Sequence, residues 1–93
     1  MVVGNLTADG TTDFQTVVSD GVQVSITGTF GSGTGTLQQL DARGNAVSIY
    51  NGGTALTATA NNDIYISLYR GDTIRLSLAG ASSPDIQYKI TGV

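Results

Sequence analysis

The sequence predicts an all-β fold, a single antiparallel β-sandwich of roughly eight short strands. Three observations support this prediction. Helix formers are scarce, with no Glu, one Lys and one Met, whereas Thr, Val, Ile and Gly are abundant. Apolar and polar residues alternate in several stretches, which is the period of a strand with one buried face. Gly, Asn and Asp interrupt the chain roughly every eight to twelve residues, as turns between short strands do.

Four stretches alternate most clearly, and each is predicted as a strand with one buried and one exposed face. They cover residues 22–30, 63–69, 73–78 and 85–91. The residues expected to point inward are Val22, Val24, Ile26, Phe30, Ile64, Ile66, Leu68, Ile74, Leu76, Leu78, Ile86, Tyr88 and Ile90.

Weaker strands are predicted between these four, at 14–18, 34–40, 46–50 and 54–60. Each ends at residues that favour turns, such as Asn51-Gly52-Gly53. This organisation fits a jelly-roll or immunoglobulin-like sandwich over residues 14–93. Residues 1–13 are rich in Gly and Thr, and we expect them to form an N-terminal arm outside the sandwich.

The tripeptide Arg70-Gly71-Asp72 occurs in adhesive proteins as an integrin ligand, but it also lies between two predicted strands. Cross-strand neighbours share a face, so a hairpin would pair Leu68 with Ile74 and leave the tripeptide as its loop. The alternative is that the two strands belong to different sheets and the tripeptide arches between them. Either arrangement explains the motif structurally, and we favour a turn over integrin recognition.

Composition excludes several classes of function. The chain has 93 residues, room for one small domain, with net charge −3 and only four basic residues, which are scattered. A nucleic-acid ligand would need a clustered basic surface. There is no Cys or His, so thiolate metal sites and the usual general base are absent. No stretch is long and apolar enough for a membrane helix, and the N-terminus has no secretion signal.

Two short motifs have a structural explanation. The glycines of 30–36, "FGSGTGT", lack the following helix that a phosphate-binding loop requires, so we interpret this stretch as a connection between strands. Asp9 and Asp13 could contribute to a calcium site, but a solvated turn is the favoured interpretation. The seven Asp residues all lie at predicted turns or strand starts, and no pair of them indicates acid–base chemistry. We therefore expect no enzymatic activity, no catalytic residues, no metal and no cofactor.

Exposed side chains are the remaining candidates for function. We expect Tyr65, Ser67, Tyr69, Arg75 and Ser77 to form one outer patch, because Tyr and Arg are enriched in protein interfaces. The opposing interpretation is that these side chains only stabilise a sheet. Low charge, 12% of residues, also suggests that part of the surface is covered by other chains.

Much of the chain resembles small β-sandwich virion proteins of tailed bacteriophages, among them capsid decoration (cement) proteins. The resemblance covers most of residues 22–92. It rests on the strand pair in "VSITGTFGSGTGTLQQLDARGNAV" (24–47), with its D-x-x-G turn, on "ALTA" (55–58), and on the pattern G-D-x-x-R-L-x-L-x-G at 71–80. A closing "DIQYKITG" (85–92) completes it.

This resemblance implies a structural role without catalysis. Decoration proteins of this type commonly bind the capsid surface as trimers at threefold or quasi-threefold positions. The implied partners are the major capsid protein and further copies of this chain, and the implied location is the virion after synthesis in the host cytoplasm. The predicted interface residues are Val2, Val3, Leu6, Tyr65, Tyr69 and Arg75. The alternative function is an adhesion or carbohydrate-binding module of a phage tail or fibre, which would use exposed tyrosines.

Overall fold

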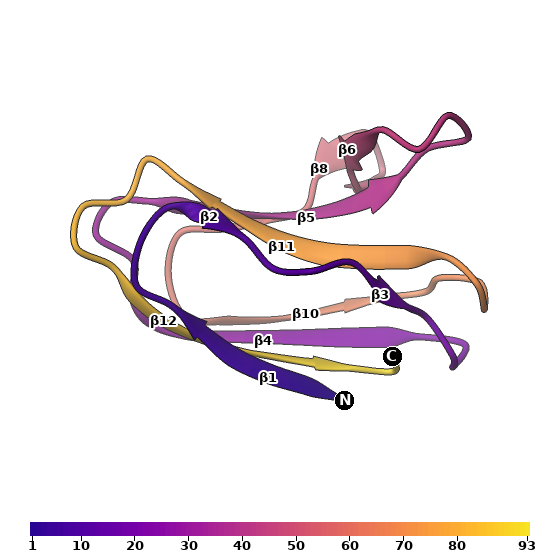
Figure 1. The fold of residues 1–93 in the computed structure, drawn as a ribbon, viewed down its shortest axis with the longest axis horizontal. Coiled ribbons are helices and arrows are strands. Elements are labelled where there is room, and N and C mark those ends of the chain that lie inside the picture. Colours follow the sequence, from indigo (N-terminus) through magenta and orange to yellow (C-terminus); the bar gives the residue numbers. More distant parts are fainter.

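The computed structural model describes residues 1–93 and contains 12 β-strands and no helix. All pairings between strands are antiparallel. Two sheets pack face to face, so the predicted antiparallel β-sandwich is confirmed (Figure 1). No helix in the chain has the length and hydropathy needed to cross a membrane.

One sheet has four strands in the order β1-β12-β4-β10. Its members are β1 (Val2–Leu6), β12 (Asp85–Thr91), β4 (Val22–Thr29) and β10 (Asn62–Ile66). The central pair, β4 and β12, joins two stretches with strict alternation, so that Val24 lies opposite Ile90 and Ile26 opposite Tyr88. Their polar residues point to the outer face, as the sequence predicts.

The second sheet is built around β11 (Thr73–Ala79) and β5 (Thr34–Leu40). Short strands pair with their outer edges: β2 (Gly10–Thr11), β3 (Gln15–Thr16), β6 (Ala46–Ser48) and β9 (Thr57–Ala58). A separate hairpin is formed by β7 (Tyr50–Asn51) and β8 (Thr54–Ala55). Figure 1 shows β6 and β8 above the C-terminal part of β5.

The core lies between the two sheets and contains 14 buried apolar side chains. Fully buried members come from both layers, with Val22, Val24, Ile26, Ile86 and Ile90 in one sheet and Leu37, Ile74 and Leu76 in the other. Most of them are the inward residues of the predicted strands, because a period of two places every second side chain on the buried face.

Residues 1–13 do not form an arm outside the sandwich, so this prediction is wrong. Strand β1 pairs with β12 over its full length, and β2 pairs with β11. Val2 and Leu6 lie opposite Ile90 and Ile86, which places them on the inner face, where they are half-buried. Weak local β propensity in a Gly-rich stretch is overcome by pairing with the regular strand β12.

The structure has more strands than the eight predicted, because β1 and β2 lie in residues 1–13 and the region 46–58 splits into four short strands where two were predicted. Three backbone hydrogen bonds explain the split. Ile49 N–H donates to the Leu37 carbonyl, Leu56 N–H to the Ile49 carbonyl, and Leu37 N–H to the Leu56 carbonyl. Two of these bonds satisfy the backbone groups of Leu37 at the edge of β5, and the third joins Leu56 to Ile49. Residues 50–55 therefore leave the sheet and form the β7–β8 hairpin. The buried side chain of Ile49 anchors the hairpin to the core.

The Arg-Gly-Asp segment arches between the sheets, since β10 and β11 belong to different layers. The hairpin pairing of Leu68 with Ile74 is therefore wrong, and the arch alternative is confirmed. Both side chains still point inward as predicted. Thus alternation identifies the buried face of each strand but not the sheet to which the strand belongs.

Candidate functional site

Three of the four tyrosines are exposed to solvent. The exposed fractions are 64% for Tyr50, 73% for Tyr65 and 86% for Tyr69. They come from β7, from β10 and from the loop after β10. The fourth, Tyr88, is half-buried against the core. Large exposed aromatic side chains are characteristic of binding surfaces, so this end of the sandwich is the first candidate site.

A groove runs along the side of the sandwich where the edge strand β10 faces β5 and β7. We call it the tyrosine groove, and its volume is about 400 Å³. Its exposed and half-buried lining consists of Gln39, Tyr50, Asn51, Tyr65, Ser67 and Leu68. The buried Ile49 and Ile66 complete the lining. No charged side chain lines the tyrosine groove.

Local structure fixes the two walls of the groove. On one side, the alternation of β10 buries Ile66 and turns Tyr65 outward. The Tyr65 hydroxyl lies over Gly21. A Cβ atom added to Gly21 would be 3.0 Å from that hydroxyl oxygen. On the other side, the hydrogen bonds around Ile49 hold the hairpin that carries Tyr50 and Asn51. Tyr50 is not among the predicted interface residues, because nothing in the sequence shows that residues 50–55 leave the sheet.

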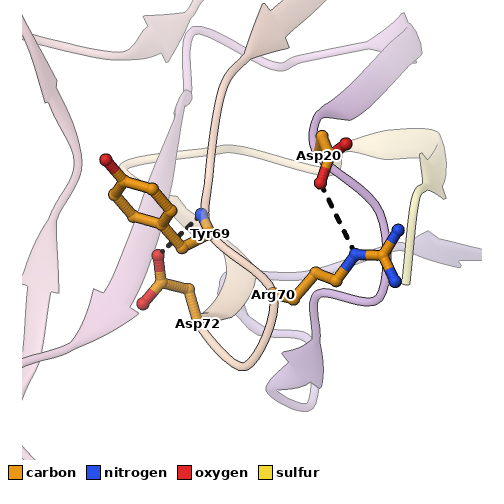
Figure 2. Close-up of polar contacts among 4 residues, drawn as sticks. All are labelled: Asp20, Tyr69, Arg70 and Asp72. Carbon is orange, nitrogen blue, oxygen red and sulfur yellow. Dashed lines mark hydrogen bonds and ion pairs between the residues drawn. The ribbon is translucent and has the colours of Figure 1, made fainter.

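The Arg-Gly-Asp segment forms a tight turn beside this groove. Asp72 N–H donates to the Tyr69 carbonyl at 3.0 Å, and Gly71, with φ +95°, takes the third position of the turn. The Asp72 carboxylate in turn accepts the Tyr69 N–H at 3.1 Å (Figure 2). The Asp72 carboxylate thus provides a hydrogen-bond acceptor for a backbone N–H of the same turn.

Contacts with the segment after β3 hold this turn in place. Gly71 N–H donates to the Val17 carbonyl, and Val17 N–H donates to the Asp72 carbonyl. Arg70 Nε lies 3.5 Å from an Asp20 carboxylate oxygen, in an ion pair that is exposed on both sides (Figure 2). An ion pair of this kind contributes little to stability. Tyr69 projects from the turn and lines a smaller hollow with Asp20, Ser67 and Leu68.

Arg75 does not share a patch with Tyr65 and Tyr69, so the single outer patch predicted from 63–78 is wrong. Arg75 lies on β11, in the other sheet. Its Nε donates to the Gln38 side-chain oxygen at 2.8 Å, and its guanidinium carbon lies 4.5 Å from the centre of the Phe14 ring. Both contacts hold the half-buried side chain against its own sheet.

The apolar residues predicted at the N-terminal interface separate into two groups. Val2 and Leu6 face the core and are only half-exposed, whereas Val3 points outward and is 64% exposed. Val3 borders a wide, shallow hollow of about 570 Å³ on the outer face of the four-stranded sheet. We call this hollow and its rim the outer face, and the other outward residues that line it are Asn5, Ser25, Thr27, Gln87 and Lys89. Asp63, Tyr65 and Asp85 point to the same side of the sheet, outside the hollow.

Three of the seven Asp side chains, those of Asp9, Asp41 and Asp72, accept backbone N–H groups. Both oxygens of Asp9 accept backbone N–H groups, from Gly80 at 3.0 Å and Ala81 at 2.9 Å. Asp9 therefore ties the β1–β2 connection to the turn after β11. No three acidic side chains gather in a geometry that could hold a metal ion.

Asp41 shows the one clear change in acidity. Its carboxylate accepts the N–H groups of Asn45 and Arg43, both at 2.9 Å, across the loop between β5 and β6. These hydrogen bonds, the one from Asn45 foremost, hold the pKa of Asp41 below its ordinary value of 3.8. The shift reflects a turn, since no second titratable group lies in the loop with it except Arg43.

Comparisons with known proteins give no match among protein families, curated proteins or solved structures. The candidate sites are therefore defined by their own geometry.

Proposed function

We propose that the chain is a non-enzymatic structural protein of a tailed-bacteriophage virion, which binds the assembled capsid shell as a homotrimer and stabilises it. The resemblance of residues 22–92 to phage decoration proteins supports this choice of partner. The protein acts on the capsid surface, with the major capsid protein as its binding partner.

The observation that carries the binding role is the low charge of the hollow on the outer face. The hollow is lined by short Ser and Thr side chains, two amides and the exposed Val3, with Lys89 as the only charged group. Interface cores are depleted in charged residues, because charges are costly to desolvate.

The mechanism of stabilisation is mass action. A protein that binds only the assembled shell lowers the free energy of that state by RT ln(1 + [L]/Kd), which is about 2.7 kcal/mol per site at a concentration one hundred times the Kd. No group on the chain needs to react. A rigid sandwich is sufficient, because its outer face is already formed before binding.

The proposal is tested by co-sedimentation of the purified chain with capsid shells of the phage whose genome encodes it, alongside native mass spectrometry. We expect saturable shell binding and a trimer of the 9.5 kDa chain. Val3→Asp should weaken shell binding by at least about tenfold, because it buries a charge in the contact. Val47→Asp, on β6 of the other sheet, is the matched control. Equal binding of both variants, or no binding of the wild type, would contradict the proposal.

A further inference from the structure

The tyrosine groove contains polar groups that the fold itself does not use. The side chains of Gln39, Asn51 and Ser67 line it and make no hydrogen bond within the chain. The neighbouring Gln38 shows the contrast, because its amide oxygen accepts from Arg75 at 2.8 Å. Two amides and a hydroxyl thus offer free donors and acceptors at one place.

Apolar surface accompanies these polar groups. Tyr50 and Tyr65 line the groove from opposite walls, and the buried Ile49 and Ile66 complete it. The volume of about 400 Å³ falls within the range of small-molecule sites, roughly 300–1,000 Å³. Tyrosines with a few directed polar groups are a recurrent composition of such sites, and Tyr side chains lose little entropy on binding.

The chemistry of the lining defines the class of ligand. No Lys, Arg, Asp or Glu lines the groove, so nothing there would recognise a phosphate, a carboxylate or an ammonium group. A saccharide matches both the aromatic rings and the neutral polar side chains of the lining. Its C–H faces pack on aromatic rings, while its hydroxyl groups, each a donor and an acceptor, pair with amides and hydroxyls.

We propose that the tyrosine groove is a binding site for a neutral oligosaccharide. This activity goes beyond capsid binding, and it uses a different surface. The tyrosine groove lies between β10 and the β7–β8 hairpin, whereas the outer-face hollow lies over β1, β12 and β4. The two linings share no residue.

The test is a glycan array of neutral, sialylated and sulfated oligosaccharides, followed by NMR titration of the full chain with the best neutral glycan. We expect a dissociation constant of about 1 mM or tighter. Tyr65→Ala and Tyr50→Ala should each weaken binding at least about tenfold. Gln39→Met, which keeps the side-chain length and removes the amide, should weaken it about fivefold. Unchanged thermal unfolding confirms that each variant is folded.

Tyr69→Ala is the matched control, because Tyr69 is the most exposed tyrosine and does not line the groove. It should bind the glycan as the wild type does. The proposal is overturned if no neutral glycan binds, if only sialylated or sulfated glycans bind, or if Tyr69→Ala is as weak as Tyr65→Ala. Val3→Asp should leave glycan binding intact, so a failure of capsid binding and a failure of the groove are distinguishable.

Discussion

The hydroxyl oxygen of Thr12 accepts the backbone N–H of Leu76 at 3.0 Å, while Thr12 N–H donates to the Leu76 carbonyl at 2.9 Å. Thr12 is the one buried polar side chain of the fold. It lies between β2 and β3, which pair with the two ends of β11. The Thr12 hydroxyl thus supplies the acceptor for the Leu76 N–H at the point on β11 that neither β2 nor β3 reaches.

Replacement of Thr12 by Val keeps the shape of the side chain and removes the acceptor. The buried Leu76 N–H then has no partner, and we expect the free energy of unfolding to fall by about 1–3 kcal/mol. Urea unfolding measures this change. Thr12→Ser retains the hydroxyl and should be the less destabilised variant. Equal stability of Thr12→Val and wild type would show that the bond contributes nothing.

Substitutions at Gly31 and Gly52 distinguish the cost of backbone strain from the cost of a steric clash. Their φ angles are similar, +59° and +63°, but a Cβ on Gly31 would clash with the Ser82 carbonyl oxygen, whereas Gly52 has open space. Gly52→Ala should cost about 1–2 kcal/mol from left-handed strain alone. Gly31→Ala should cost about 2–5 kcal/mol, since overpacking adds to that strain. Thermal unfolding of the two variants tests the order, and equal losses would contradict the packing at Ser82.

Asp41 should titrate below its ordinary pKa of 3.8, because the N–H groups of Asn45 and Arg43 favour its charged form. The folded state then binds this proton less readily than the unfolded state. Its contribution to stability is therefore complete above the unfolded pKa and is lost as the pH falls through the lower folded pKa. Carboxyl-carbon NMR gives the titration directly. A midpoint at or above 3.8 in the folded protein would be inconsistent with these hydrogen bonds.

The Arg-Gly-Asp turn should not support cell adhesion that an Arg-Gly-Asp peptide competes for. Asp72 is half-buried, and its carboxylate is already bonded to Tyr69 N–H. Asp72→Ala should instead lower the free energy of unfolding by about 1 kcal/mol through loss of that bond. Asp63→Ala, which removes an exposed carboxylate from β10, is the control. Adhesion to immobilised protein that depends on Asp72 would overturn this view of the motif.

Strand positions and buried faces were predictable because they depend on local alternation. Val22, Val24 and Ile26 are buried, and the polar residues between them face outward, as their spacing requires. Sheet membership was not predictable in the same way. Nothing local to Leu68 or Ile74 shows that their strands lie in opposite layers, and this arrangement places Arg75 on a different sheet from Tyr65.

The candidate site was only partly predictable for the same reason. Tyr65 was identified from its outward position in an alternating strand. Tyr50 was missed, because its role depends on hydrogen bonds between Leu37, Ile49 and Leu56, which are distant in sequence. Residues 1–13 were misjudged as an arm, since β1 takes its structure from pairing with β12 at the other end of the chain.

The most direct test of the proposed function is a cryo-electron microscopy reconstruction of capsid shells of the encoding phage, with and without the purified chain. The account predicts extra density at threefold or quasi-threefold positions, into which three copies of the sandwich fit with the outer face, including Val3 and Thr27, in the contact. Shells that show no added density at saturating protein, or density only on the tail, would contradict a capsid decoration role.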